Sequence, residues 1–173
     1  MIKSELRKAM INKRSSMTPD QVNEKSKHIV DQIRLDQDYI NASIVALFYP
    51  MKEEVNLLTL LEDQKTFLFP RVEKDGIHFY AYHQEMTWIK SAFGVLEPDG
   101  KTNQYKNNID YMLAPALAIS KDFYRVGYGK GYYDRFLSQY RPKKVMGVIY
   151  DFQEVETFHI DEYDQKLDGM IKG

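Results

Sequence analysis

The residues with the greatest potential for chemistry lie in one stretch, which runs from Arg125 to Arg135 and reads Arg-Val-Gly-Tyr-Gly-Lys-Gly-Tyr-Tyr-Asp-Arg. Three glycines alternate with other residues directly before a segment with helical spacing. Glycine allows close backbone approach, so that successive N–H groups can converge on an anion at a helix N-terminus. Arg125 and Lys130 add positive charge, and Asp134 offers the oxygen ligands that Mg²⁺ prefers. The stretch therefore predicts a phosphate site next to a magnesium site.

The spacing of the glycines differs from that of two common phosphate-binding loops. The stretch lacks the four-residue gap and the Lys-Ser/Thr pair of the P-loop, and its G-x-G-x-G spacing is not the dinucleotide fingerprint. A glycine-rich turn that caps a helix, with its tyrosines in the core, would use the same residues. Local chemistry alone supports the phosphate site and the ordinary turn about equally.

The stretch closely resembles the R-L-G-x-G-x-G-Y-Y-D-R signature of the 5-formyltetrahydrofolate cyclo-ligases, also called 5,10-methenyltetrahydrofolate synthetases. Further segments resemble motifs of that family and occur in the same order: Lys3 to Arg7, Glu54-Val55, Asp110 to Leu117, and Asp164-x-x-Leu167-Asp168. The chain departs from the family where Leu, Gly and Asp are common, with Val126, Ala116 and Ser120. None of these changes removes a charged group assigned to phosphate or metal.

The resemblance implies an ATP- and Mg²⁺-dependent ligase that cyclises 5-formyltetrahydrofolate to 5,10-methenyltetrahydrofolate and releases ADP and phosphate. The formyl oxygen would attack the γ-phosphate of ATP, and N10 would then attack the activated carbon and displace phosphate. This chemistry needs alignment and charge neutralisation rather than a covalent enzyme intermediate. It is therefore compatible with a chain that has no cysteine.

Carried over residue by residue, the resemblance assigns catalytic, nucleotide, folate and metal roles. The catalytic residues would be Arg125, Lys130 and Tyr132. ATP would contact Lys3, Ser4, Glu5, Leu6, Arg7, Arg125, Val126, Gly127, Tyr128, Gly129, Lys130, Gly131, Tyr132 and Tyr133. The folate would contact Tyr49, Met51, Glu54, Tyr128, Gly129, Lys130, Gly131 and Tyr132. The metal ligands would be Asp134 and Asp164.

Some of these assignments have a structural alternative of similar weight. Lys3 and Arg7 lie four residues apart and share one helical face, but without the other motifs a solvated basic helix would be the better interpretation. The carboxylate of Glu54 suits the N–H donors of a pterin. Core packing is at least as good an interpretation for Tyr49 and Met51, and a better one for Trp88, which could also border the folate pocket.

The segments that position these residues alternate between helical and extended patterns. Helices are expected at 2–14, from a capping box at Thr18-Pro19-Gln21 to Ile33, at 57–61 and at 132–140. Strands are expected at 44–49, 66–69, 77–82, 110–114 and 145–149, with a loop at 97–108 and an irregular tail at 151–173. The pattern predicts a single α/β domain with a mixed, largely parallel open sheet flanked by helices in three layers. Residues 1–173 would form one cyclo-ligase domain with a helical arm at about 1–35.

Composition narrows the functional class. The chain of 173 residues has 24 basic and 25 acidic side chains, which argues against a general nucleic-acid binder. It has no apolar run of membrane-spanning length and no signal-peptide core. We expect a cytoplasmic monomer that binds ATP and 5-formyltetrahydrofolate, with or without a polyglutamate tail, and no nucleic acid or membrane. A non-catalytic phosphate-binding module and an RNA-binding or structural protein with a basic helix remain the alternatives.

Overall fold

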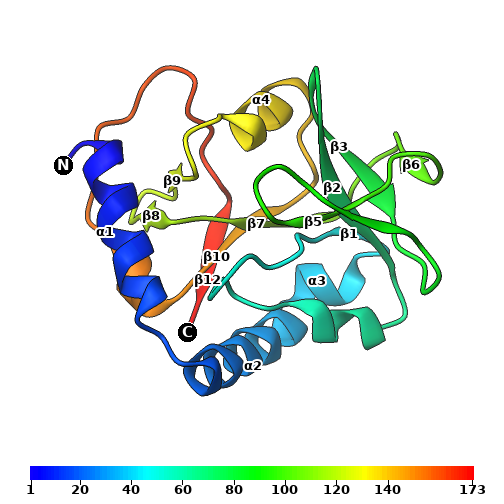
Figure 1. The fold of residues 1–173 in the computed structure, drawn as a ribbon, viewed down its shortest axis with the longest axis horizontal. Coiled ribbons are helices and arrows are strands. Elements are labelled where there is room, and N and C mark those ends of the chain that lie inside the picture. Colours follow the sequence, from blue (N-terminus) through cyan, green and yellow to red (C-terminus); the bar gives the residue numbers. More distant parts are fainter.

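A seven-stranded mixed sheet divides the molecule into three layers (Figure 1). The structure is a computed structural model that describes all 173 residues. The strand order is β12 (Gly169–Lys172), β10 (Val145–Ile149), β7 (Tyr111–Pro115), β1 (Ile44–Ala46), β2 (Thr66–Glu73), β3 (Gly76–Ala81) and β6 (Gln104–Tyr105). The strands from β12 to β2 are mutually parallel, whereas β3 and β6 are antiparallel to their neighbours. The predicted single-domain α/β fold is confirmed.

Alternate residues of the central strands supply two separate apolar cores, because successive side chains of a strand point to opposite faces. Val45 and Leu113 pack with helices α2 (Pro19–Leu35) and α3 (Gln37–Asn41) on one face. Ala46 and Met112 pack with helix α4 (Tyr132–Gln139) on the other. Burial of both faces explains why these strands read as continuous apolar runs rather than as an alternating pattern.

Helix α1 (Lys3–Ser15) lies beside the large sheet and packs on a small second sheet (Figure 1). That sheet contains β11 (Glu154–Val155), β8 (Ala118–Ser120) and β9 (Arg125–Val126). Leu6 and Met10 of α1 are buried against Ala118, Val126 and Phe158. This packing places the N-terminal helix directly beside the segment that follows β9, although more than 100 residues separate them in the sequence.

A third sheet is a two-stranded hairpin of β4 (Trp88–Lys90) and β5 (Leu96–Pro98). Two 3₁₀ helices complete the chain, η1 (Leu58–Glu62) and η2 (Asp151–Gln153). Thr18 and Gln21 form the expected capping box at the start of α2. No helix combines the length and the apolar character that crossing a membrane would require.

Several predicted boundaries were wrong for identifiable reasons. The strand expected at 44–49 ends at Ala46, and the one expected at 66–69 continues through Pro70 to Glu73. Proline is tolerated there because β1 pairs with β2 only as far as Leu68, which leaves β2 without a partner on that side. The expected loop at 97–108 contains the end of β5 and all of β6.

The prediction of an irregular tail at 151–173 was also wrong. The tail contains η2, β11 and the edge strand β12, which pairs in parallel with β10 from Gly169 to Lys172. A four-residue strand is too short to give a clear periodic signal, and its pairing depends on a partner more than 20 residues away. Only the segment between β11 and β12 is irregular, and this segment borders the cleft described next.

Candidate active site

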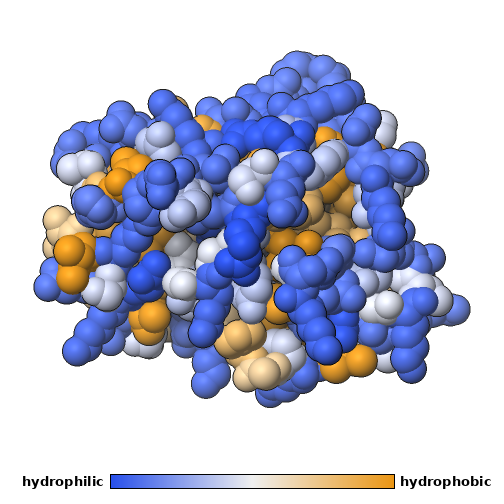
Figure 2. Space-filling model, turned by 90° about the horizontal axis from the view of Figure 1, so that it is seen from above, coloured by the Kyte–Doolittle hydropathy of each residue, from blue (hydrophilic) through white to orange (hydrophobic).

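A cleft of about 930 Å³ lies at the carboxyl ends of the parallel strands. The chain runs from β1 to β2 on one side, then returns to β7 on the other side of β1 and continues to β10. In open α/β sheets such a reversal of strand order leaves a crevice beyond the strand ends. Phe48, which follows β1, and Pro115, which ends β7, both line the cleft. Figure 2 shows this side of the molecule, with apolar side chains in a hollow between hydrophilic ones.

The glycine loop, residues 127–131, forms one wall of the cleft between β9 and α4. Gly129 has φ +100° and Gly131, which caps α4, has φ +69°, a region that other residues rarely adopt. A Cβ atom at Gly127 would lie 2.5 Å from the Nη2 atom of Arg125. Glycine is therefore required at Gly129 and Gly131 by the left-handed backbone, and at Gly127 by the close approach of a guanidinium.

Two arginines hold the glycine loop by its carbonyl groups. Arg7 of α1 donates from Nε to the Gly127 carbonyl at 2.8 Å, and Arg135 of α4 donates from Nη1 to the Lys130 carbonyl at 2.7 Å. None of the backbone N–H groups from Gly127 to Gly131 donates a hydrogen bond to another backbone group. The loop thus offers free N–H donors at the start of a helix, which is the arrangement that binds phosphate oxygens.

Arg125 and Tyr133 present buried polar groups that the protein leaves without full partners. The Arg125 side chain is 7% exposed, donates from Nε to the Pro115 carbonyl at 3.0 Å, and forms no ion pair. Its guanidinium lies 4.9 Å from the centre of the Tyr133 ring. Burial lowers the pKa of Arg125, and the hydroxyl of Tyr133 is buried without any hydrogen-bond partner. Because such groups are costly, their place on the cleft wall indicates that a polar ligand completes them.

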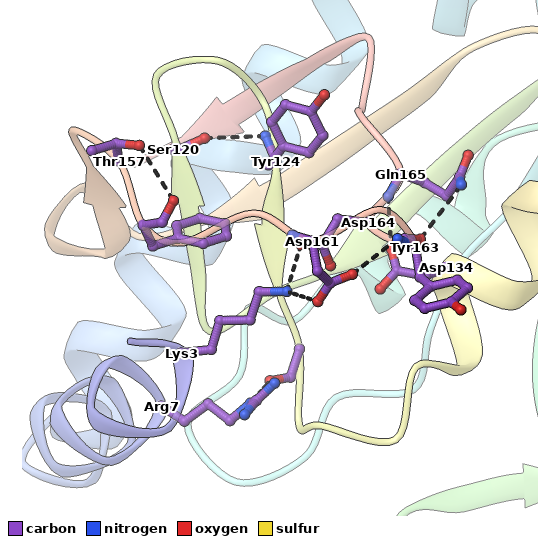
Figure 3. A network of polar contacts seen from close by, with 12 residues as sticks. Lys3, Arg7, Ser120, Tyr124, Asp134, Thr157, Asp161, Tyr163, Asp164 and Gln165 are labelled. Atoms are coloured by element: carbon purple, nitrogen blue, oxygen red, sulfur yellow. Dashed lines mark hydrogen bonds and ion pairs between the residues drawn. The ribbon is translucent and has the colours of Figure 1, made fainter. Parts of the chain in front are cut away.

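Lys3 reaches from α1 to the acidic segment near the end of the chain (Figure 3). Its Nζ atom lies 2.5 Å from Oδ2 of Asp164 and 3.0 Å from Oδ2 of Asp161. Asp134 of α4 accepts a hydrogen bond from the backbone N–H of Gln165 at 3.2 Å. Burial raises the pKa of Asp134, and the nearby Asp164 raises it further while Arg125 and Lys3 oppose the shift. The proposed phosphate residue Lys3 and the proposed metal ligand Asp164 are therefore paired with each other.

The corner of the cleft that contains Lys3, Asp134 and Asp164 offers carboxylates that could bind a metal ion. The chain has no group of three or more His, Cys, Asp or Glu side chains able to hold a metal ion. Mg²⁺ commonly takes only one or two carboxylates and completes its shell with water and substrate phosphates. Asp134 and Asp164 both line the cleft beside the glycine loop. They fit a cation that is held jointly with a nucleotide, and they do not fit a cage built from protein ligands alone.

Glu54 lies in the turn that follows β1 and is 6% exposed. Its Oε1 atom accepts a hydrogen bond from the backbone N–H of Met51 at 3.0 Å. Burial raises the pKa of Glu54, while the Met51 N–H and the charge of Arg14 oppose the rise. Tyr49 and Met51 also line the cleft, although Tyr49 packs at the same time against Phe69. This end of the cleft therefore combines one buried acceptor with apolar and aromatic surface.

The structure brings together on the cleft wall all but three of the residues to which the family resemblance assigned a role. Ser4 and Glu5 are exposed on α1, Leu6 is buried in the core, and none of the three lines the cleft. Trp88 packs on Tyr49 and Phe69 and does not line the cleft either.

Sequence reasoning missed two buried charged residues near the cleft. Glu97 of β5 lines it and accepts a hydrogen bond from the Val72 N–H at 2.9 Å. Arg14 lies behind Glu54, where its Nη1 atom is 3.7 Å from Oε2 of the carboxylate. A signal for Arg14 was present, since it continues the apolar face of α1 four residues after Met10.

Comparisons with known proteins find similar sequences over the whole length of the chain. The profile of the 5-formyltetrahydrofolate cyclo-ligase family matches residues 1–173. The 5-formyltetrahydrofolate cyclo-ligase of Mycoplasma genitalium is 33% identical over 98% of this chain and 96% of that protein. The one from Mycoplasma pneumoniae is 31% identical over 99% of this chain and 98% of its own length.

Solved structures are similar over the same extent. The NMR structure of Aquifex aeolicus 5,10-methenyltetrahydrofolate synthetase superposes with a TM-score of 0.86 at 31% identity, covering 99% of this chain and 90% of that one. The 5,10-methenyltetrahydrofolate synthetase from Mycoplasma pneumoniae gives a TM-score of 0.79 at 29% identity, covering 99% and 98%.

Proposed function

Because the chain belongs to the 5-formyltetrahydrofolate cyclo-ligase family and is a ligase, we propose that residues 1–173 act as one domain that converts 5-formyltetrahydrofolate to 5,10-methenyltetrahydrofolate with ATP. One observation carries the proposal. The cleft joins a wall of unsatisfied cationic and N–H donors, at Arg125 and residues 127–131, to a buried carboxylate at Glu54. A nucleotide triphosphate and a pterin are complementary to these two ends.

The glycine loop and its flanking cations would bind the triphosphate. Arg125 would supply two free guanidinium nitrogens, since only its Nε atom is engaged with the protein. Lys130 is exposed on the same loop and would act as a mobile point charge. Arg7 fixes the loop through Gly127 and would add charge from α1, while Lys3 would join it on release from Asp164. Tyr132 lines the same wall and would border the reacting groups.

Asp134 and Asp164 would hold Mg²⁺ together with the phosphate oxygens. When bound, the ion would neutralise charge that develops on the transferred phosphoryl group. Lys3 would then exchange one partner for another, since its ammonium is bonded to Asp164. Substrate loading in this corner therefore replaces one ion pair by another rather than exposing a bare charge.

Glu54 would accept hydrogen bonds from the pterin, with Tyr49 and Met51 against the ring system. In the first step the formyl oxygen would form a bond to the γ-phosphorus as the bond to ADP breaks. In the second, N10 would attack the formyl carbon, lose its proton, and expel phosphate as the ring closes. Arg125 and Lys130 would neutralise the phosphoryl charge in both steps, and no bond to the enzyme would form.

The test is an assay of purified protein with ATP, Mg²⁺ and 5-formyltetrahydrofolate. We expect the absorbance of the methenyl product to rise, and ADP to form in equal amount and only when the folate is present. ADP formation at the same rate with and without the folate, or binding of ATP without turnover, would instead support a phosphate-binding module. The monomeric state and the use of polyglutamylated folates stay predictions from the sequence.

A further inference from the structure

Arg14 is a buried cation that does not itself line the cleft. It lies in the last turn of α1, where it is 5% exposed and shares the apolar face with Leu6 and Met10. A charge at such a position costs free energy unless hydrogen bonds and an opposite charge compensate it. A residue that served only to pack α1 would be apolar here. The guanidinium must therefore be compensated by specific polar partners.

Its two partners are both cleft residues. Arg14 donates from Nη2 to the hydroxyl of Tyr128 at 2.5 Å, and its Nη1 atom lies 3.7 Å from Oε2 of Glu54. The Tyr128 hydroxyl in turn lies 3.4 Å from the same Glu54 oxygen. Because a guanidinium has donors only, the Tyr128 oxygen must accept from Arg14 and turn its own proton towards Glu54. The three groups therefore form a hydrogen-bonded chain in which Arg14 donates to Tyr128 and Tyr128 donates to Glu54.

This chain joins three segments that are distant in the sequence. Arg14 comes from α1, Glu54 from the turn after β1, and Tyr128 from the glycine loop. The other Glu54 oxygen is held by the N–H of Met51, so both oxygens of the carboxylate are fixed. A bound group within the cleft then meets a carboxylate with one orientation rather than a freely rotating one.

We propose that Arg14 is a positioning residue that orients Glu54 and Tyr128 for the folate, an inference that rests on the proposed function. Arg14 touches neither substrate. It acts through the two side chains in front of it, and it ties the carboxylate at the folate end to the loop that would carry the nucleotide.

The experiment compares three variants by steady-state kinetics at saturating ATP and Mg²⁺. Arg14→Met keeps the apolar stem and removes all donors, Arg14→Lys keeps the charge, and Lys13→Met removes an exposed charge from the same helical turn as a control. We expect Arg14→Met to raise KM for 5-formyltetrahydrofolate at least tenfold, with a smaller change in kcat. Arg14→Lys should show an intermediate KM, because an ammonium cannot reproduce the fork geometry. Lys13→Met should match the unmodified chain.

A second readout separates positioning from simple loss of structure. Tyr128→Phe should raise KM for the folate in the unmodified chain but add less than twofold to Arg14→Met, because the two groups act through one chain. Two changes with independent structural effects would multiply instead. If Arg14→Met melts below the assay temperature, Arg14→Lys decides, and a folate KM equal to that of the unmodified chain would overturn the proposal.

The pH profile provides a third readout. Burial raises the pKa of Glu54, and the Met51 N–H, Arg14, Tyr128 and Arg125 oppose the rise. The phenol groups of Tyr133 and Tyr150 also lie near this carboxylate. Loss of the Arg14 charge should move the acid limb of kcat/KM for the folate to higher pH. An equal loss of activity at every pH would contradict the proposal, whereas an inactive unmodified chain would instead refute the proposed function.

Discussion

The substitution Arg125→Met tests the proposed catalytic role of Arg125 separately from its structural role. Methionine keeps most of the apolar stem and removes a guanidinium that is 7% exposed and forms no ion pair. Truncation of one partner in a buried ion pair typically costs about 3–5 kcal/mol, because the other charge is left unpaired. No such partner is left here, so the stability cost should be far smaller.

The change in the free energy of unfolding caused by Arg125→Met is the sum of three contributions. The substitution loses the hydrogen bond to the Pro115 carbonyl, about 1.5–3 kcal/mol for a charged donor, and the contact with the Tyr133 ring, about 0.5–2 kcal/mol. It also removes the desolvation penalty of a buried cation, about several kcal/mol. The opposing contributions nearly cancel, so we expect a net change within about 2 kcal/mol. At about 2–4 °C per kcal/mol for a chain of this size, Tm should move by less than about 8 °C in either direction.

Activity, unlike stability, should change strongly in Arg125→Met. A fixed donor to the transferred phosphoryl group typically contributes about 3–4 kcal/mol, so kcat/KM for ATP should fall by about 10²–10³. The assay pairs thermal melting of the free protein with methenyl-folate formation at varied ATP. A large loss of Tm with a proportionate loss of activity would show that Arg125 is structural. Full activity with unchanged Tm would show that no phosphate reaches it.

Three further substitutions test other parts of the site. Lys130→Ala should raise KM for ATP about tenfold and leave Tm unchanged, because the side chain is exposed and the loop is held there through its backbone carbonyl; unaltered ATP kinetics would remove Lys130 from the site. Asp134→Asn should raise the Mg²⁺ concentration for half-maximal activity about tenfold, since an amide keeps an acceptor for Gln165 N–H but loses the charge; an unshifted Mg²⁺ titration would exclude Asp134 as a ligand. Burial raises the pKa of Glu54, so the carboxylate gains its proton at higher pH than an ordinary Glu and folate affinity should fall as pH decreases through that value. Glu54→Gln should bind the folate more weakly with no such acid limb, and an acid limb that survives in this variant would assign the titration to another group.

The features that sequence could predict are those encoded locally. The glycine loop, its flanking cations and Asp134 lie within 11 consecutive residues, so their chemistry could be inferred together. The central strands were visible because both of their faces are buried, which gives unbroken apolar runs such as Ile44 to Phe48. The capping box of α2 depends on residues three positions apart, and it formed as expected.

The features that sequence could not predict depend on contacts between distant segments. The ion pair of Lys3 with Asp164 joins residues 161 positions apart, and no local pattern encodes it. Strand β12 exists because β10 and α2 pack beside it, not because four residues have a strong preference of their own. The place of Arg14 on the apolar face of α1 was a local signal of burial, but its contacts with Glu54 and Tyr128 join distant segments and have no local pattern.

The distance in sequence between the two ends of the site has a consequence for how the protein reaches its native state. Lys3 and Arg7, near the start of the chain, and residues 161–165, near its end, line the same cleft. The sheet forms mostly through parallel pairing of strands that are distant in the sequence. Such contacts must overcome the entropy of long loops, so refolding should be slow for a chain of this length. Nucleotide affinity should consequently appear in the last kinetic phase, after the secondary structure has formed. A shortened chain that lacks residues 161–173 would keep the glycine loop but could not assemble the corner that Lys3 and Asp164 complete.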